Sequence, residues 1–184
     1  MIIVYIILAV VILYLIIAYN SLISLKNRTE EAWSDITVQL KRRYDLIPNL
    51  VNAVKGYAKH ETSVFEKVTE ARANAIDAKD IKAKEKAENE LSQSLKSIFA
   101  VAESYPNLKA SDNFMKLQED LTDTENKIEA SRRFYNANVR ELNIKIESFP
   151  TNIIANMFKF AKKVLFEVDP SQKEAIEVAP KVEM

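Results

Sequence analysis

The sequence predicts an all-α protein, in which one N-terminal transmembrane helix is followed by an up-and-down bundle of about four long antiparallel helices. Three observations lead to this fold class. Residues 2–18 are apolar without interruption. Gly56 is the only glycine in the 184 residues, whereas tight β-hairpins favour glycine. Beyond the apolar segment, apolar residues recur at alternating spacings of three and four, which is typical of amphipathic helices packed nearly parallel to one another.

The N-terminal apolar segment has the length of a membrane span. A helix rises about 1.5 Å per residue, so residues 2–18 reach about 25 Å, and uncharged residues up to Leu25 extend them toward the bilayer's hydrocarbon core of about 30 Å. No basic residue precedes the segment and no small-x-small cleavage site follows Ala18. These features favour an uncleaved anchor over residues 1–25, against a cleaved secretory signal and a buried core helix as the alternatives.

Basic residues predict the orientation of this anchor. Lys26 and Arg28 follow the segment closely, and none precedes it. The positive-inside rule counts basic residues within about 15–20 positions of a span. We therefore expect a single-pass protein of the cell membrane, with a short N-terminus outside and the bundle in the cytoplasm.

The bundle is predicted over residues 26–149, from helices near 20–44, 46–76, 81–104 and 111–148, the first being continuous with the span. Asp45 is expected to cap the second helix, with Pro48 in its first turn, where proline loses little hydrogen bonding. Asn49 is expected to satisfy backbone groups nearby. If Pro48 only kinks one long helix, the body of the protein has three helices.

Residues 150–168 are predicted to form an amphipathic C-terminal helix. Its apolar residues lie largely on one face, and Lys159, Lys162 and Lys163 lie on the flank and the opposite side. Two interpretations stay open, since the helix can lie in a membrane interface beside Phe158 or cap the end of the bundle. Residues 169–184 are polar and contain proline, which predicts a disordered tail.

Composition argues against several classes of function. The net charge is zero, so no broad positive field favours nucleic acid. The absence of cysteine and the single His60 leave no thiolate or multi-histidine metal site within one chain. With one glycine, no phosphate-binding loop can be drawn. We expect no enzyme activity, catalytic residue, cofactor, metal or small-molecule substrate.

Two groups of charged residues are candidates for contact or structure. Lys41, Arg42 and Arg43 form either a basic site for phosphate, anionic lipid or an acidic partner, or a solvated helix end. Glu125 and Arg132 are seven positions apart, hence on one helix face, where a buried ion pair would fix the register of packing.

Several motifs resemble the LemA family. They are QLKRRYDLIPNLVNAVKGYAKHE from Gln39, YPNLKA at 105–110, FMKLQEDLTDTENKIEASRRFYNANVRELN at 114–143 and FPTNIIA at 149–155. Their order and number make the resemblance specific, and it runs from the anchor to about Phe166. It implies an N-terminal membrane helix, a small extracellular N-terminus, an all-α bundle of the bacterial envelope and no established catalytic activity. It also implies a membrane partner, because members are sometimes encoded beside membrane proteases or other envelope proteins.

The expected function is therefore that of a membrane-anchored, non-catalytic helical scaffold or adaptor. It would act by self-assembly as a homo-oligomer or by binding a membrane protein partner, with a membrane protease as one candidate. The alternative is a lipid-binding or membrane-remodelling protein that uses the 150–166 helix. The candidate contacts to a partner or the lipid bilayer are Lys41, Arg42, Arg43, Lys159, Lys162, Lys163 and Phe158, and the candidate structural polar residues are Asp45, Pro48, Asn49, Glu125 and Arg132.

Overall fold

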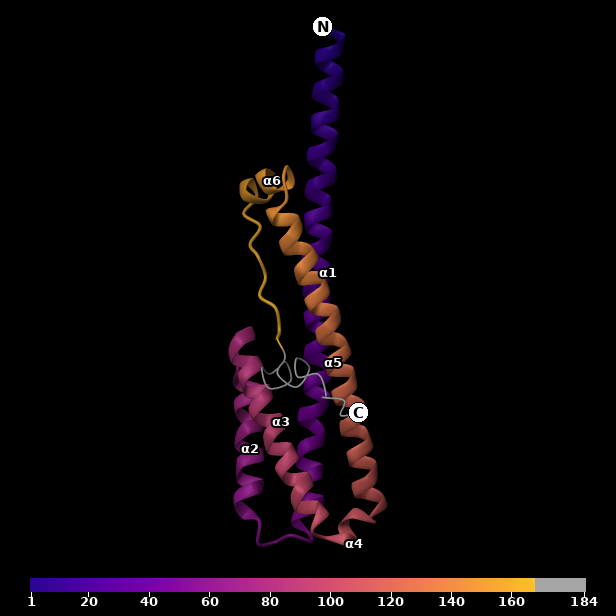
Figure 1. Ribbon diagram of the computed structural model, residues 1–184, viewed down its shortest axis with the longest axis vertical. Helices are drawn as coiled ribbons and strands as arrows, with labels where there is room; N and C mark the ends of the chain where they lie inside the picture. The colour runs from indigo at the N-terminus through magenta and orange to yellow at the C-terminus, as the bar shows by residue number, and fades with distance from the viewer. Residues whose placement is uncertain (168–184) are drawn as a thin grey trace, which may run out of the picture. The chain divides into compact units, whose positions relative to one another are not determined.

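The computed structural model describes residues 1–167, and within that range it contains helices and no strand (Figure 1). The predicted all-α fold class is confirmed. The predicted tail at 169–184 lies outside the described residues. The helices are α1 (Ile2–Lys55), α2 (Thr62–Asp77), α3 (Ile81–Glu103), α4 (Pro106–Lys109), α5 (Asp112–Glu147) and α6 (Thr151–Met157).

Helix α1 continues through Pro48, so the prediction that a new helix begins there is wrong. A proline inside a helix leaves the carbonyl four residues earlier without its usual donor. That carbonyl belongs to Tyr44, and Arg72 Nε of α2 donates to it at 2.8 Å. The side chain of Arg72 thus replaces the missing hydrogen bond. The break between the first two helices lies instead at 56–61, and four long helices remain: α1, α2, α3 and α5.

The predicted boundaries of α3 and α5 agree with the structure to within a few residues. Asp80 caps α3, where its side chain accepts a hydrogen bond from the backbone N–H of Ala83 at 2.8 Å. The chain turns at Tyr105–Pro106 into the short α4. Helix α5 ends at Glu147, just before Phe149 and Pro150.

The chain divides into two compact units. Unit 1 consists of Met1–Gln39 and Lys127–Leu165. Unit 2 consists of Leu40–Asn126 together with Phe166 and Glu167, the last two described residues. Helices α1 and α5 each contribute to both units, whereas the predicted division into anchor, bundle and C-terminal helix follows sequence order and stays a prediction.

In unit 1, three helices share an apolar core. The buried side chains come from the same face of α1, the end of α5 and the inner face of α6, and Tyr19 and Phe160 pack against them. Trp33 and Tyr135 add an aromatic pair with ring centroids 5.3 Å apart. The core residues are Ala18, Leu22, Leu25, Leu142, Ile146, Ile154 and Ala155.

The apolar N-terminal part of α1 is not core. Of its most apolar window of 18 residues, only 6 % is buried, so the interpretation as a buried core helix is wrong. By length and composition this helix fits a membrane span, and it is the one helix among the described residues that does so.

Helix α6 is shorter than predicted, since it ends at Met157 and residues 160–167 are not helical. Lys159 has a φ of 56°, in the left-handed region that terminates helices. The N–H groups of Lys159 and Phe160 donate back to the carbonyls of Asn156 and Ala155, at 3.2 and 2.9 Å. This pair of bonds is a Schellman motif, which closes the helix.

The segment after α6 returns along α5 and is fixed by two side chains. Asn143 bonds both the N–H and the carbonyl of Lys163, each at 2.9 Å. The hydroxyl of Tyr135 donates to the carbonyl of Val164 at 2.9 Å. We call residues 158–165 the strap. At Lys163 and Val164 its backbone groups bond side chains of α5 rather than a further helical turn.

Unit 2 has a longer apolar seam, which joins the end of α1, α2, α3, α4 and the start of α5. Figure 1 shows α2 and α3 side by side. Asp80 lies in the short connection between them and caps α3. The ring centroids of Phe99 and Phe114 lie 6.3 Å apart between α3 and α5. The large buried side chains are Leu40, Tyr44, Ile47, Leu50, Val54, Phe65, Val68, Leu91, Leu95, Ile98, Leu108, Phe114, Leu121 and Phe166.

Candidate functional site

The three consecutive basic residues of α1 have three different environments. Successive side chains on a helix point about 100° apart, so a run of three covers more than half of the circumference. Lys41 is exposed and pairs with Asp45 one turn later at 2.8 Å. Arg42 is exposed, and its guanidinium lies 3.5 Å from Asp120 and 3.1 Å from Asp123. Arg43 is buried, so the run is not a single basic surface.

Arg43 is the centre of a buried polar cluster in unit 2. Its guanidinium bonds Glu88 of α3, Glu125 of α5 at 2.5 Å, and the hydroxyl of Ser92 at 3.3 Å. The phenol of Tyr44 donates to the other oxygen of Glu88. Arg43 is 2 % exposed and Glu88 is 4 % exposed, so both charges depend on this geometry. We call these five residues the Arg43 cluster.

Electrostatics fix the protonation of this cluster. Burial opposes the charged form of Arg43, but the charges of Glu88 and Glu125 outweigh it and raise the pKa of the guanidinium. Burial, and then the charge of Glu88, raise the pKa of Tyr44 above its ordinary value. At neutral pH the cluster therefore holds a cationic Arg43 and a neutral Tyr44. It joins α1 to α3 and α5.

Asp45, Pro48 and Asn49 do not form the predicted helix start. All three lie within α1 and are exposed. Asp45 accepts from Lys41 instead of capping a new helix. The hydrogen bond that Pro48 cannot donate to Tyr44 is supplied by Arg72. Sequence reasoning missed this role of Arg72.

Glu125 also differs from the expectation of a buried ion pair with Arg132. The side chain of Glu125 is 54 % exposed, and it bonds Arg43. Glu125 belongs to unit 2, and Arg132, which is partly buried, belongs to unit 1. The interpretation of Glu125 as a buried residue is wrong.

Sequence reasoning also missed Glu88, although a signal for it exists. Glu88, Leu91 and Leu95 share the spacing of three and four that defines the buried seam of α3. A carboxylate on an apolar seam requires a cationic partner when the seam is buried. Arg43 is likewise a charged residue at a seam position, since it lies on α1 three residues after Leu40 and four before Ile47.

The candidate contact residues after α6, which are Phe158, Lys159, Lys162 and Lys163, all lie in unit 1. The amines of Lys162 and Lys163 pair with Glu147 at 2.6 Å and Glu30 at 3.3 Å. Phe158 lies against Tyr19, with ring centroids 4.7 Å apart. Lys159 is exposed and has no ion pair within residues 1–167. The lysines thus do not form one basic face.

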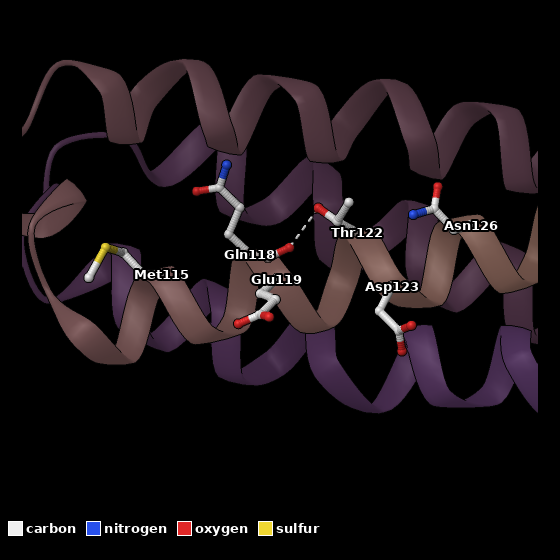
Figure 2. A pocket seen from close by; sticks show the side chains of 6 residues that line it. All are labelled: Met115, Gln118, Glu119, Thr122, Asp123 and Asn126. Atoms are coloured by element: carbon white, nitrogen blue, oxygen red, sulfur yellow. Dashed lines mark hydrogen bonds between the residues drawn. The ribbon is translucent and has the colours of Figure 1, made fainter.

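The surface hollows offer little to a small molecule. One is lined by six side chains of α5 alone, so no second wall encloses a ligand (Figure 2). Thr122 within it donates to the carbonyl of Gln118 at 2.8 Å. No group of three potential metal ligands is found in the described part of the chain. The lining residues are Met115, Gln118, Glu119, Thr122, Asp123 and Asn126.

Comparison with known proteins gives a consistent result. The model of the LemA family matches residues 32–182. "Magnetosome protein MamQ 2" of Paramagnetospirillum magneticum is 25 % identical over 183 aligned residues, which cover 85 % of this chain and 67 % of that protein. "Magnetosome protein MamQ" of Magnetospirillum gryphiswaldense is 22 % identical with the same coverage. "Protein LemA" of Metamycoplasma hominis is 27 % identical over 163 residues, 86 % of this chain and 72 % of that protein. None of these names states a reaction.

Proposed function

Since this chain belongs to the LemA family, we propose that it is a membrane-anchored, non-catalytic helical scaffold. It holds its helical body beside the membrane and binds either a second copy or a membrane protein there. The observation that carries this proposal is α1, in which an exposed apolar segment and core-forming residues belong to one unbroken helix. A helix of this kind attaches the body directly to the bilayer, without a flexible linker.

The chemistry of the polar residues supports a structural role. The most buried charges, Arg43 and Glu88, neutralise each other. The hollow on α5 has a single wall. The other main hollow is lined by Val64 and by polar residues of α2 and α3. Catalysis needs a nucleophile or base beside a site that excludes water. Neither hollow supplies that combination.

Exposed apolar side chains in unit 1 are the proposed points of contact with a partner. Phe134 and Ile144 of α5 are 55 % and 62 % exposed, and Val38 of α1 is 60 % exposed. Apolar and aromatic side chains supply much of the binding energy at protein interfaces. A membrane protease remains one candidate partner on grounds of the family. The two basic residues that follow the span, Lys26 and Arg28, support a bundle on the cytoplasmic side.

Site-specific photo-crosslinking in intact membranes tests the scaffold. A photoreactive amino acid at Phe134 or Ile144 should give a discrete adduct, either a dimer of this chain or a product with one membrane protein. The matched control is Glu141, an exposed polar position of α5 in the same unit. If crosslinking at native expression gives only the monomer at all three positions, the result would count against a scaffold that uses this surface.

A further inference from the structure

Helix α6 has an apolar face on each side. Its inner face, with Ile154 and Ala155, is buried in the core of unit 1. On the other side, Ile153 and Met157 are 55 % and 67 % exposed, and Phe149, just before the helix, is 80 % exposed. Large apolar side chains gathered on one short element indicate contact with something apolar.

The position of α6 along α1 indicates what that contact is. The hydroxyl of Tyr14, inside the apolar segment, lies 3.2 Å from the hydroxyl of Thr151, the first residue of α6. Tyr19 packs against Phe158, at the other end of α6. Within unit 1, α6 therefore lies at the level of the last turns of the apolar segment, as the ribbon also shows (Figure 1).

The length of α1 beyond α6 is too short to cross a bilayer. From Ile2 to Leu13 the helix spans only about 18 Å, whereas the hydrocarbon core is about 30 Å thick. Tyr14–Ala18 must therefore also lie within or at the edge of the apolar region for the segment to act as a span. Any element at their level lies at that edge as well.

We propose that α6 lies in the interfacial layer of the phospholipid bilayer, with Phe149, Ile153 and Met157 in contact with acyl chains. The apolar segment of α1 is exposed as well, and α6 contacts its last turns through Tyr14 and Tyr19. These two tyrosines provide the amphipathic rings that are enriched at this depth. Interfacial helices bury their apolar face about 5–10 Å into the boundary between head groups and acyl chains.

This assignment changes which residues contact lipid. Lys162 and Lys163 are neutralised by Glu147 and Glu30, so the attachment is mainly apolar rather than electrostatic. Lys159 follows Met157 and Phe158 closely and is placed to reach the head groups. Membrane attachment of α6 should therefore change little with salt, which differs from the behaviour of a basic amphipathic helix. The inference goes beyond the scaffold and does not require it.

Spin labels on the full-length chain in vesicles of phosphatidylethanolamine and phosphatidylglycerol test the inference. The protein has no cysteine, so Ile153→Cys and Met157→Cys each give one labelled position. Ile6→Cys, in the apolar segment, is the control for lipid, and Glu141→Cys, exposed on α5, is the control for water. Helical content by circular dichroism verifies that each variant is folded.

The expected result is that labels at 153 and 157 collide with oxygen more readily than with a water-soluble nickel chelate. The ratio of the oxygen collision rate to the nickel collision rate at these labels should lie between the ratios of the two controls. It should stay unchanged in high salt. Labels as accessible to nickel as the one at Glu141 would overturn the proposal. Labels shielded from both reagents would overturn it too, because they would place a protein surface, such as a second copy, over α6.

Discussion

The two units are stabilised by different means. Unit 1 combines an apolar core with aromatic pairs, and its polar bonds hold the strap at Tyr135 and Asn143. Unit 2 places a guanidinium and a carboxylate inside its seam, at Arg43 and Glu88. In an apolar core, the loss of unfolding free energy grows with the number of side-chain atoms removed. In a buried ion pair, removal of either partner leaves the other charge buried without compensation. The LemA-like motif that begins at Gln39 therefore contains the buried charge, Arg43, whose replacement unit 2 should tolerate least.

The largest effect is expected from Arg43→Ala. Removal of the guanidinium leaves Glu88 buried without its cation, which should cost about 3–5 kcal/mol of unfolding free energy. Denaturant unfolding in detergent micelles measures the loss. Arg42→Ala is the matched control, because its half-exposed pairs with Asp120 and Asp123 should be worth less than about 1 kcal/mol. Equal losses in the two variants would contradict a special role for the buried pair.

Ile154→Ala should cost about 2–5 kcal/mol, because it opens a cavity in the core of unit 1. This loss should be the same at low and high salt, since no charge is involved. Ile153→Ala is the control one position away on the outer face, and it should leave the unfolding midpoint in micelles nearly unchanged. A strong salt dependence of the Ile154→Ala loss would show that the two units are not stabilised differently.

Alkaline pH should destabilise the protein through its buried tyrosines. The pKa values of Tyr44 and Tyr135 are raised by burial, so above about pH 10 the unfolded chain releases these protons while the folded chain retains them. Unfolding free energy should then fall by about 1.4 kcal/mol per pH unit for each tyrosine. Below about pH 10 neither tyrosine makes the unfolding free energy depend on pH.

The variant Tyr44→Phe isolates one of these contributions. Its stability at pH 8 should be lower, because Glu88 loses a donor, but its fall between pH 10 and 11 should be shallower than that of the unmodified chain. Unfolding curves at each pH measure both quantities. Parallel pH profiles for the two proteins would contradict the burial of an unionised Tyr44.

The smallest effect is expected at the end of α6. A non-glycine residue in the left-handed region costs about 1–2 kcal/mol, so Lys159→Gly should raise the stability of unit 1 by up to about 1 kcal/mol after the added chain entropy. Lys159→Val should lower it, because a β-branched residue fits this conformation poorly. Thermal unfolding measures the effect, and the midpoint should be highest with glycine at 159, intermediate with lysine and lowest with valine. The reverse order would contradict the Schellman motif at the end of α6.

Much of the fold was predictable because the spacing of apolar residues is a local signal. The seams gave the helical class, and Asp80 marked the start of α3 with its capping side chain. Pro48 was misjudged because the compensating donor, Arg72, is 28 residues away in sequence. The end of α6 was misjudged because left-handed lysine has no distinct sequence signal, and the hydrophobic pattern continues past it.

The candidate site was less predictable for a related reason. Lys41, Arg42 and Arg43 are alike in sequence, and only the facing helices determine which one is buried. Glu88 lay on the seam and was overlooked, although its spacing to Leu91 and Leu95 was visible. Charged residues at seam positions are therefore the signal to search for first in helical proteins of this kind.

The short apolar part of α1 also has a consequence for where in a membrane the protein accumulates. Residues 2–18 reach about 25 Å, a few ångströms less than an average hydrocarbon core. The uncharged residues that follow, such as Leu22 and Leu25, pack in the core of unit 1 and add little length that can face lipid. A bilayer that thins locally matches such a helix, at a cost that grows with each ångström of mismatch. The protein should therefore concentrate laterally in thin bilayer regions and be depleted from thick, ordered ones.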